Sequence, residues 1–436
     1  MKFPLVTSAV FLVASIASAA SAQSLIRDAS STSAVSSDTI KTITSAVAKA
    51  DLGALDQLRK SSADDVTQLL VAMAQERILG DFDKSSADAT ACEQKFFDSA
   101  VQTALFCARF HVGNLRLAGR ESDADKADQG MVKRFQSKLS DEQAQNLQNY
   151  ASTYDALPVL SVQRPNNGFS IPLLYAEHRE RNGGITETSK RDIAVTVNGQ
   201  TVNMRFGTGP AYLQLDEDTA KQLGARILDT HAAVKTVFNE KVGVQTGILD
   251  KLSFDGVTVE NAPVVIVPRT VPSIGMGIFK YLGAFRITKD AVIVYGPNDQ
   301  RPANSDPILI GSYINGGNIH IVTSLSINGE QHLTVINTAD PFYLTGSKGA
   351  LSDLDTRFAG QIQGRGVNGV RHGETVDRTL ANVVIGGQPM QMKFGVLADE
   401  NLPWNYQLGR SALQDMDIYL DFQNRRSALI PRSDIR

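Results

Sequence analysis

The sequence predicts an α+β multidomain protein, with an N-terminal all-α domain of helical hairpins followed by two all-β lobes. Three observations support this: apolar residues recur at helical intervals early in the chain, short β-branched strands between glycine turns fill the rest, and four landmarks of the β part occur twice in the same order. The chain has 436 residues, 42% of them hydrophobic, which is enough for several cores. The expected segments are an export signal (1–22), the helical domain (23–158), a linker (159–189), the first lobe (190–296) and the second lobe (306–436).

The first residues are typical of a cleaved export signal. Lys2 precedes an uncharged apolar run from Leu5 to Ile16, and A-x-A cleavage sites follow, the second ending at Ala22. A membrane anchor is the alternative, but about a dozen apolar residues fall short of the ~20 that span a bilayer. We therefore expect a periplasmic or secreted protein without a membrane span. The formal net charge of -3 gives no reason to expect a nucleic-acid partner.

The helical domain is predicted from the spacing of its apolar residues. They recur at three- and four-residue intervals in 65–79, 96–117 and 131–154, and Gly80 and Gly119 provide stops. This pattern is typical of tetratricopeptide-like helical hairpins, although no exact sequence repeat is present. Such a domain either binds a partner or serves as a spacer beside the β-lobes, and the sequence leaves the oligomeric state open.

The two cysteines, Cys92 and Cys107, predict a disulfide in the helical domain. Export permits disulfide formation, but fifteen residues on one unbroken helix would separate the two by about 22 Å. A bridge therefore requires the segment around Cys92 to fold back along the helix that carries Cys107. His111 lies four residues after Cys107, so a metal or nucleophile pair is the alternative. No further ligand cluster accompanies it, and we predict the disulfide.

Two β segments repeat each other, which predicts a duplicated lobe. The matched landmarks are 197–200 with 327–330, 206–213 with 336–344, 252–257 with 383–388, and 274–278 with 408–412. The first landmark is an Asn-Gly hairpin turn in both copies. Four landmarks in the same order indicate duplication of one β unit of about 130 residues.

In this order the landmarks resemble the retropepsin-like and pepsin-type aspartic peptidases, over residues 190–296 and 320–431. In that family a hairpin leads into an apolar-Asp-Thr-Gly-Ala loop, a flap follows, and an apolar-apolar-Gly strand and a short helix close the lobe. The segment 408–422 is a particularly good match to this closing element. The resemblance implies that each lobe is an acid-protease-like barrel and that the tandem pair forms a bilobal arrangement.

Both catalytic aspartates of the family are absent from the matched loops. Gly207 and Asn337 occupy their positions, whereas the threonines that cross-brace the loops in the family are retained as Thr208 and Thr338. Glycine has no side chain, and an asparagine amide is no general base near neutral pH. The remaining loop partners are Gly209 and Ala339. We predict no catalytic residue and no cofactor, and the scattered histidines give no metal spacing.

Three other carboxylates lie close to these loops in the sequence. Asp216 and Asp218 follow Gly207, and Asp340 follows Asn337. We interpret all three as solvated acids that help to cap the next segment. The alternative is an active aspartic-type peptidase that uses non-standard carboxylates.

The ligand-facing residues are predicted in the second flap and before the last strand of that lobe. The segment 364–369 fits G-x-G-x-x-G, but no apolar helix follows it, so dinucleotide binding is unsupported. Gly366 and Gly369 would give the flap flexibility. Trp404 and Tyr406 would line a groove for an extended peptide or glycan, with core filling as the alternative.

The absence of both aspartates favours a pseudoenzyme. We predict a module that binds an extended peptide or protein partner between the lobes by strand addition. A peptidase with relocated acids and a purely structural envelope protein are the alternatives.

Overall fold

The chain forms a helical unit and a β unit, each described below by itself. The computed structural model describes residues 15–16, 35–155, 158–179, 185–209, 212–235, 241–268, 270–340, 342–347, 357–365, 371–397 and 404–432. The predicted export signal lies outside these residues except for β1 (Ser15–Ile16). The helical unit comprises Ser15–Leu160 with Ile308–Ile321, and the β unit comprises Ser161–Pro307 with Val322–Arg436. Helices followed by β-lobes confirm the predicted fold class.

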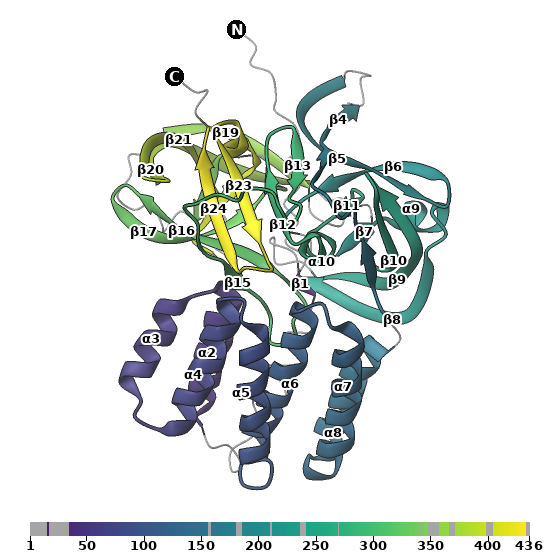
Figure 1. Cartoon of the computed structure of the whole chain (residues 1–436), viewed down its shortest axis with the longest axis vertical. Coiled ribbons are helices and arrows are strands. Elements are labelled where there is room, and N and C mark those ends of the chain that lie inside the picture. Colours follow the sequence, from purple (N-terminus) through teal and green to yellow (C-terminus); the bar gives the residue numbers. More distant parts are fainter. Residues whose placement is uncertain are drawn as a thin grey trace. The chain divides into compact units, whose positions relative to one another are not determined.

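The helical unit is a series of capped helices (Figure 1). They are α2 (Ser37–Lys49), α3 (Leu52–Ser61), α4 (Asp65–Ile78), α5 (Phe82–Phe96), α6 (Val101–Leu117), α7 (Glu121–Phe135), η1 (Gln136–Lys138) and α8 (Asp141–Asp155). Ser36, Asp51, Asp64 and Asp81 each accept a hydrogen bond from the backbone N–H three residues later, which satisfies a free donor at the helix start. The helix predicted over 131–154 is two helices, since Ser140 accepts from the N–H of Gln143 and caps a new one. No helix among the described residues is long and apolar enough to cross a membrane.

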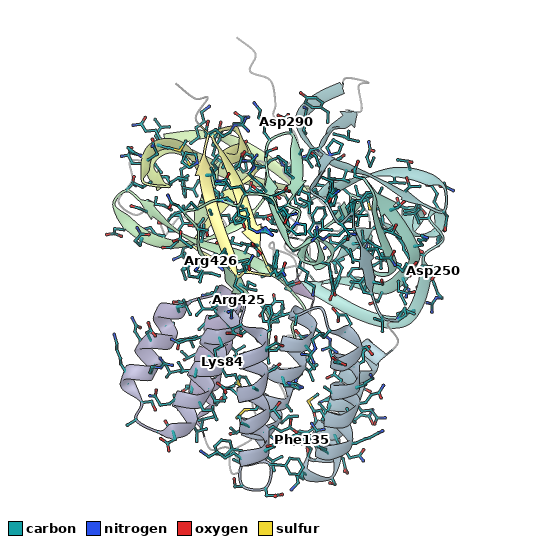
Figure 2. The ribbon with its side chains drawn as sticks, viewed as in Figure 1. Lys84, Phe135, Asp250, Asp290, Arg425 and Arg426 are labelled. Atoms are coloured by element: carbon teal, nitrogen blue, oxygen red, sulfur yellow. A yellow bond between two sulfur atoms is a disulfide. The ribbon has the colours of Figure 1, made fainter. Side chains whose placement is uncertain are left out.

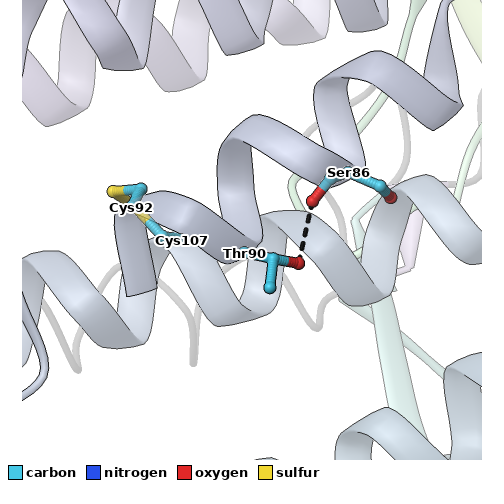
Figure 3. The surroundings of a disulfide bond; sticks show 4 residues. All are labelled: Ser86, Thr90, Cys92 and Cys107. Carbon is cyan, nitrogen blue, oxygen red and sulfur yellow. Dashed lines mark hydrogen bonds between the residues drawn. A yellow bond between two sulfur atoms is a disulfide. The ribbon is translucent and has the colours of Figure 1, made fainter. Parts of the chain in front are cut away.

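The hairpin of α5 and α6 brings Cys92 and Cys107 together and confirms the predicted disulfide. Their Cα atoms are 5.9 Å apart and their sulfur atoms are bonded. Beside the bridge, the Thr90 hydroxyl donates to the carbonyl oxygen of Ser86 (2.9 Å; Figure 3). The cysteines are therefore structural, and no thiol is left to form a pair with His111.

An aromatic pair packs the connection between α5 and α6 against α7. Phe135 of α7 is fully buried (Figure 2), and its ring meets the ring of Phe97 edge-on, with 5.2 Å between centroids. Aromatic pairs in this geometry add to the free energy gained by burying their area.

Residues 308–321 belong to the helical unit, although they were expected in the second lobe. Arg77 of α4 is fully buried and donates to the carbonyl oxygens of Tyr313 (3.2 Å) and Ile314 (3.0 Å). Its guanidinium carbon lies 3.5 Å from the centroid of the Phe110 ring in α6. Residues 313–316 form a turn in which the N–H of Gly316 donates to the carbonyl oxygen of Tyr313 (2.9 Å), and the buried arginine adds hydrogen bonds to the backbone of this turn.

The β unit contains three sheets. The first-lobe elements are β4 (Leu174–Arg179), β5 (Ile185–Val197), β6 (Gln200–Phe206), β7 (Leu213–Leu215), α9 (Glu217–Gln222), β8 (Arg226–Lys235), β9 (Lys241–Phe254), β10 (Val257–Ile266), β11 (Ser273–Ile274), α10 (Met276–Phe279) and η2 (Lys280–Leu282). The second-lobe elements are β16 (His320–Ile327), β17 (Glu330–Asn337), β18 (Leu344–Ser347), β19 (Arg357–Arg365), β20 (Arg371–Ile385), β21 (Gln388–Leu397), β22 (Tyr406–Gly409) and η4 (Arg410–Gln414), and the short β15 (Leu309–Gly311) lies in the segment that belongs to the helical unit. The third sheet uses β3 (Phe169–Pro172), β12 (Ala284–Ile287), β13 (Ala291–Val294), β14 (Asp306–Pro307), β23 (Met416–Asp421) and β24 (Arg426–Pro431), and the short β2 (Ser161–Gln163) pairs with β10 of the first lobe.

The two lobes repeat one strand order, as the duplication predicts. The order is β8-β9-β10-β7-β11-β6-β5 in the first lobe and β19-β20-β21-β18-β22-β17-β16 in the second. Each lobe also closes by an extra pairing, between β9 and β5 and between β20 and β16. The register matches too: Val197 pairs with Leu252 in the first lobe, and Ile327 pairs with Val383 in the second. Residues 252 and 383 are the positions that the sequence landmarks align.

A six-stranded sheet, in the order β14-β24-β23-β12-β13-β3, joins the lobes (Figure 1). Strand β12 follows the first lobe and β23 follows the second, and they pair antiparallel from Ala284 with Asp421 to Ile287 with Ile418. The predicted linker 159–189 also contributes strands, since β2 pairs with β10, β3 with β13 and β4 with β5. Sheet edges present unpaired backbone groups, and this segment covers three of them.

Candidate functional site

The candidate site is formed by the two loops that follow β6 and β17. Phe206 pairs in parallel with Ile274 of β11, and Ile336 pairs in parallel with Leu408 of β22. The next residue in each strand is therefore structurally equivalent, which places Gly207 and Asn337 at matching positions.

A reciprocal pair of hydrogen bonds braces the loops across the lobes. The N–H of Thr208 donates to Oγ1 of Thr338 (3.1 Å), and the N–H of Thr338 donates to Oγ1 of Thr208 (3.0 Å). The Thr208 hydroxyl in turn donates to the carbonyl oxygen of Ile336 (2.5 Å). Both threonines are buried, so the brace lies away from water and orients one loop against the other.

The side chain of Asn337 forms its hydrogen bonds within the second lobe. It is 2% exposed, and its Nδ2 donates to Oε1 of Gln407 (3.0 Å). Its Oδ1 accepts from the N–H of Ala339 (3.2 Å). Gly207 offers no side chain opposite it. The two positions together therefore hold one neutral amide and no group that could activate water by taking its proton.

The neighbouring acids divide into surface and interior residues. Asp216 accepts from the N–H of Thr219 (3.0 Å) and begins helix α9, and Asp218 is exposed on that helix, as predicted. The prediction of a solvated Asp340 is wrong, because this residue is fully buried. Its Oδ1 accepts from the N–H of Phe342 (3.0 Å) and its Oδ2 from the Thr345 hydroxyl (2.8 Å).

Burial governs the ionisation of Asp340. Loss of water raises the pKa of its carboxyl from the ordinary value of 3.8 to about 6, against the opposing effects of the two hydrogen bonds and of the Arg410 charge. Both oxygens are already occupied, so Asp340 anchors the loop rather than facing a substrate.

Sequence reasoning missed a cluster of buried arginines beside the loops, which we call the arginine cluster: Arg191, Arg205 and Arg410. Arg191 and Arg205 come from β5 and β6 of the first lobe, and Arg410 directly follows β22 of the second. Arg410 donates through Nη2 to the carbonyl oxygen of Thr338, which ties it to the braced loop. Arg191 and Arg205 both lower the pKa of Arg410, and Arg191 also lowers that of Arg205, which indicates that the three charges interact.

The arginine cluster is short of anionic partners. Among the described residues its single ion pair joins Nε of Arg191 to Oδ1 of Asp192, at 4.0 Å. Burial lowers the pKa of Arg205 to about 10 and that of Arg410 to about 9, and the repulsion of neighbouring arginines adds to both shifts. A signal was present in the sequence: Arg205 occupies the position that the duplication aligns with the apolar Val335.

The four residues predicted to contact a ligand fall into two pairs. Gly366 and Gly369 lie outside the described residues. Trp404 and Tyr406 are 5% and 3% exposed, and the Tyr406 ring lies 4.6 Å from the His332 ring between centroids within the second-lobe core. Their burial favours core filling, the alternative interpretation. The described residues include no group of His, Cys, Asp and Glu able to hold a metal ion.

The fold and the braced loops are those of a duplicated, bilobal β protein. Residues 193–280 match the family model described as aspartyl protease, which confirms the predicted resemblance on the first lobe. The second lobe repeats the strand order of the first.

Solved structures with similar chains include basic 7S globulin from soybean and the aspartic proteinase from Irpex lacteus. The soybean protein is 12% identical, with a TM-score of 0.35 over 61% of this chain and 95% of its own. The Irpex enzyme is 10% identical, with a TM-score of 0.38 over 61% of this chain and 98% of its own. No curated protein sequence matches the chain.

Proposed function

We propose that this protein is an exported, catalytically inactive relative of the aspartic peptidases that binds an extended peptide or protein segment between its two lobes. One observation carries the proposal: the Thr208–Thr338 brace is intact while the positions it would align hold Gly207 and Asn337. Aspartic proteolysis needs two carboxylates that share one proton. The arrangement that orients the loops is retained and the acid–base pair is not.

The rival function is a peptidase that uses another carboxylate. Among the described acids Asp340 is the candidate, because it is buried beside the loop and its pKa is raised to about 6. Its two oxygens accept hydrogen bonds from Phe342 and Thr345, which leaves the carboxylate turned into its own lobe. This geometry favours binding over cleavage.

Strand addition is the expected mode of binding. In each lobe a long hairpin, β8–β9 or β19–β20, lies toward one end of the strand order, and β19 is the terminal strand of the second-lobe sheet. An extended peptide can pair its backbone with such an edge strand and place alternate side chains in neighbouring pockets. Export is proposed from the signal-like N-terminus alone.

The test uses the mature chain, residues 23–436, with fluorescein-labelled casein as an unfolded protein probe. We expect a saturable rise in anisotropy and no cleavage at acidic or neutral pH. Thr208→Val should weaken binding by disturbing the brace, whereas Thr201→Val, an exposed change on the same strand β6, should leave it unaltered. Cleavage that is blocked by pepstatin and persists through rigorous purification would contradict inactivity. Equal binding by wild type and Thr208→Val would place the binding surface elsewhere.

A further inference from the structure

The first lobe carries a buried polar row that the second lobe lacks. Asp192 of β5 pairs with Arg205 of β6, Arg205 with Ser273 of β11, and Ser273 with Gln214 of β7. Residues paired in this way project from one face of the sheet, so the four side chains form a row. All four contain a buried polar atom without a hydrogen-bond partner in the described part of the chain. Native interiors rarely leave such atoms unsatisfied.

The arginine cluster extends this row toward the second lobe. Nε of Arg191, Arg205 and Arg410 also lacks a hydrogen-bond partner among the described residues, although Arg205 and Arg410 are only 9% and 7% exposed. A guanidinium stays charged in a protein, and a buried charge is costly without an anion. The unsatisfied donors therefore mark a place where an anionic oxygen would be stabilised.

The local charge favours a monoanion as the ligand. The cluster holds three guanidinium groups, and the charges of two carboxylates, Asp192 and Asp340, act on Arg410. This leaves one positive charge unmatched at neutral pH, where Asp340 is ionised because its pKa is about 6. The charge of Asp192 also disfavours a dianion such as phosphate. The planar guanidinium matches a carboxylate through paired N–H donors.

We propose that Arg205 and Arg410, assisted by Arg191, bind a carboxylate of the bound peptide at the place where active relatives hold their own two carboxylates. The inference rests on the proposed function for the identity of the ligand, and on the buried arginines for its chemistry. The carboxylate can come from a peptide C-terminus or from an acidic side chain. Because Arg410 donates to Thr338 and Arg205 lies two residues before Gly207, the anion would sit against both braced loops.

The primary experiment uses acetate, a small carboxylate, so that the result does not depend on peptide binding. Saturation-transfer NMR on the mature chain at constant ionic strength should detect acetate but not acetamide, its neutral counterpart. Arg205→Met and Arg410→Met should each weaken acetate binding by about tenfold or more, as expected for loss of a charge-assisted hydrogen bond. Arg226→Met is the matched control, because Arg226 is exposed and pairs weakly with Asp250 at the edge of the lobe (3.9 Å; Figure 2).

A second variant controls for the misfolding of the Arg205→Met and Arg410→Met variants. Asp192→Val with Arg205→Val installs the residues that the second lobe carries at the same positions, Val322 and Val335. It should fold and still lose acetate. Acetate binding that is absent from the wild type, or equal in all variants, would overturn the proposal.

Binding measurements with peptides distinguish a C-terminal carboxylate from an acidic side chain. They also distinguish the carboxylate-site proposal from the proposed function. A peptide with a free C-terminus that binds more tightly than its amide identifies the terminus, and a gain from an internal glutamate in the amidated peptide identifies the side chain. Casein binding without acetate binding would refute the carboxylate site and leave the proposed function standing. Acetate binding without any peptide or casein binding would refute the proposed function and leave the site standing.

Discussion

The two lobes share a strand order but differ in what they bury next to the braced loops. The first lobe opposes Asp192 and Arg205 across β5 and β6, and the second opposes Val322 and Val335 across the equivalent strands β16 and β17. One duplicated scaffold thus accommodates two opposite charges in one copy and two valines in the other. The packing of the strands does not require the charges, because the second lobe forms the same pairing without them.

The next two strands of the row show the same contrast. In the second lobe, Gln407 accepts from Asn337, and Thr345 donates to Asp340. In the first lobe the equivalent residues are Ser273 and Gln214, and Oγ of Ser273 and Oε1 of Gln214 lack partners among the described residues. Among the described residues both first-lobe side chains therefore keep an unsatisfied polar atom, whereas in the second lobe Thr345 is paired and Gln407 is paired through Oε1 but not through Nε2.

The largest expected effect comes from removing only one of these two opposite charges. Asp192→Val leaves the buried arginines without their nearest anion and should lower the free energy of unfolding by about 3–5 kcal/mol. The double change Asp192→Val with Arg205→Val should recover most of this loss, because it reproduces the second-lobe pattern. Urea denaturation of both variants is the measurement. A double variant no more stable than the single one would show that the lobes are not interchangeable here.

A pH-dependent effect is expected for Asp340, which has no acidic counterpart in the first lobe. Its pKa is raised from 3.8 to about 6, so the folded state retains a proton that the unfolded state has lost. The stability that this proton contributes is present below pH 3.8 and is lost as the pH rises to about 6. Relative to Asp340→Asn, the wild type should therefore lose about 2–3 kcal/mol across this interval. Urea melts of both proteins across the interval measure it, and parallel curves would exclude Asp340 as the titrating group.

The two threonines of the brace should contribute unequally to the free energy of unfolding. Oγ1 of Thr208 accepts one hydrogen bond and donates another, to Ile336, whereas Oγ1 of Thr338 accepts from the N–H of Thr208. Thr208→Val should cost about 2 kcal/mol and Thr338→Val about 1 kcal/mol, since each leaves buried backbone groups unsatisfied. The double variant should cost less than the sum, because the bonds are reciprocal. Thermal or urea unfolding of the three variants measures these losses. Equal and additive losses in the free energy of unfolding would contradict the expected asymmetry.

The smallest effect is expected at Asn337 itself. In Asn337→Asp the new carboxylate oxygen would face Oε1 of Gln407, but rotation of the Gln407 amide presents its Nε2, which has no partner among the described residues. The change should therefore cost less than about 1 kcal/mol near neutral pH. Combined with Gly207→Asp, it should become strongly unfavourable as pH rises, because two adjacent carboxylates cannot both ionise cheaply. Additive effects of the two substitutions at every pH would show that these side chains do not meet.

Much of the scaffold was predictable because its signals are local. The Asn-Gly turns at 198–199 and 328–329 adopt positive φ at both residues, the conformation that such turns require. Helix caps, the cysteine hairpin and the repeated landmarks likewise depend on residues near one another in the sequence. The brace between Thr208 and Thr338 was predictable only through the family resemblance, since 130 residues separate the two.

The sequence by itself determined the order of helices and strands, the duplication, and the presence of Gly207 and Asn337 at the matched loop positions, because periodicity, turn residues and residue identity are all read along the chain. The tertiary structure alone decided that Asp340 is buried, that Arg77 binds the backbone of 313–314, and that Arg191, Arg205 and Arg410 converge. Burial and charge pairing depend on residues distant in sequence, so the same arginine is a solvated surface group in one fold and an unmatched interior charge in this one.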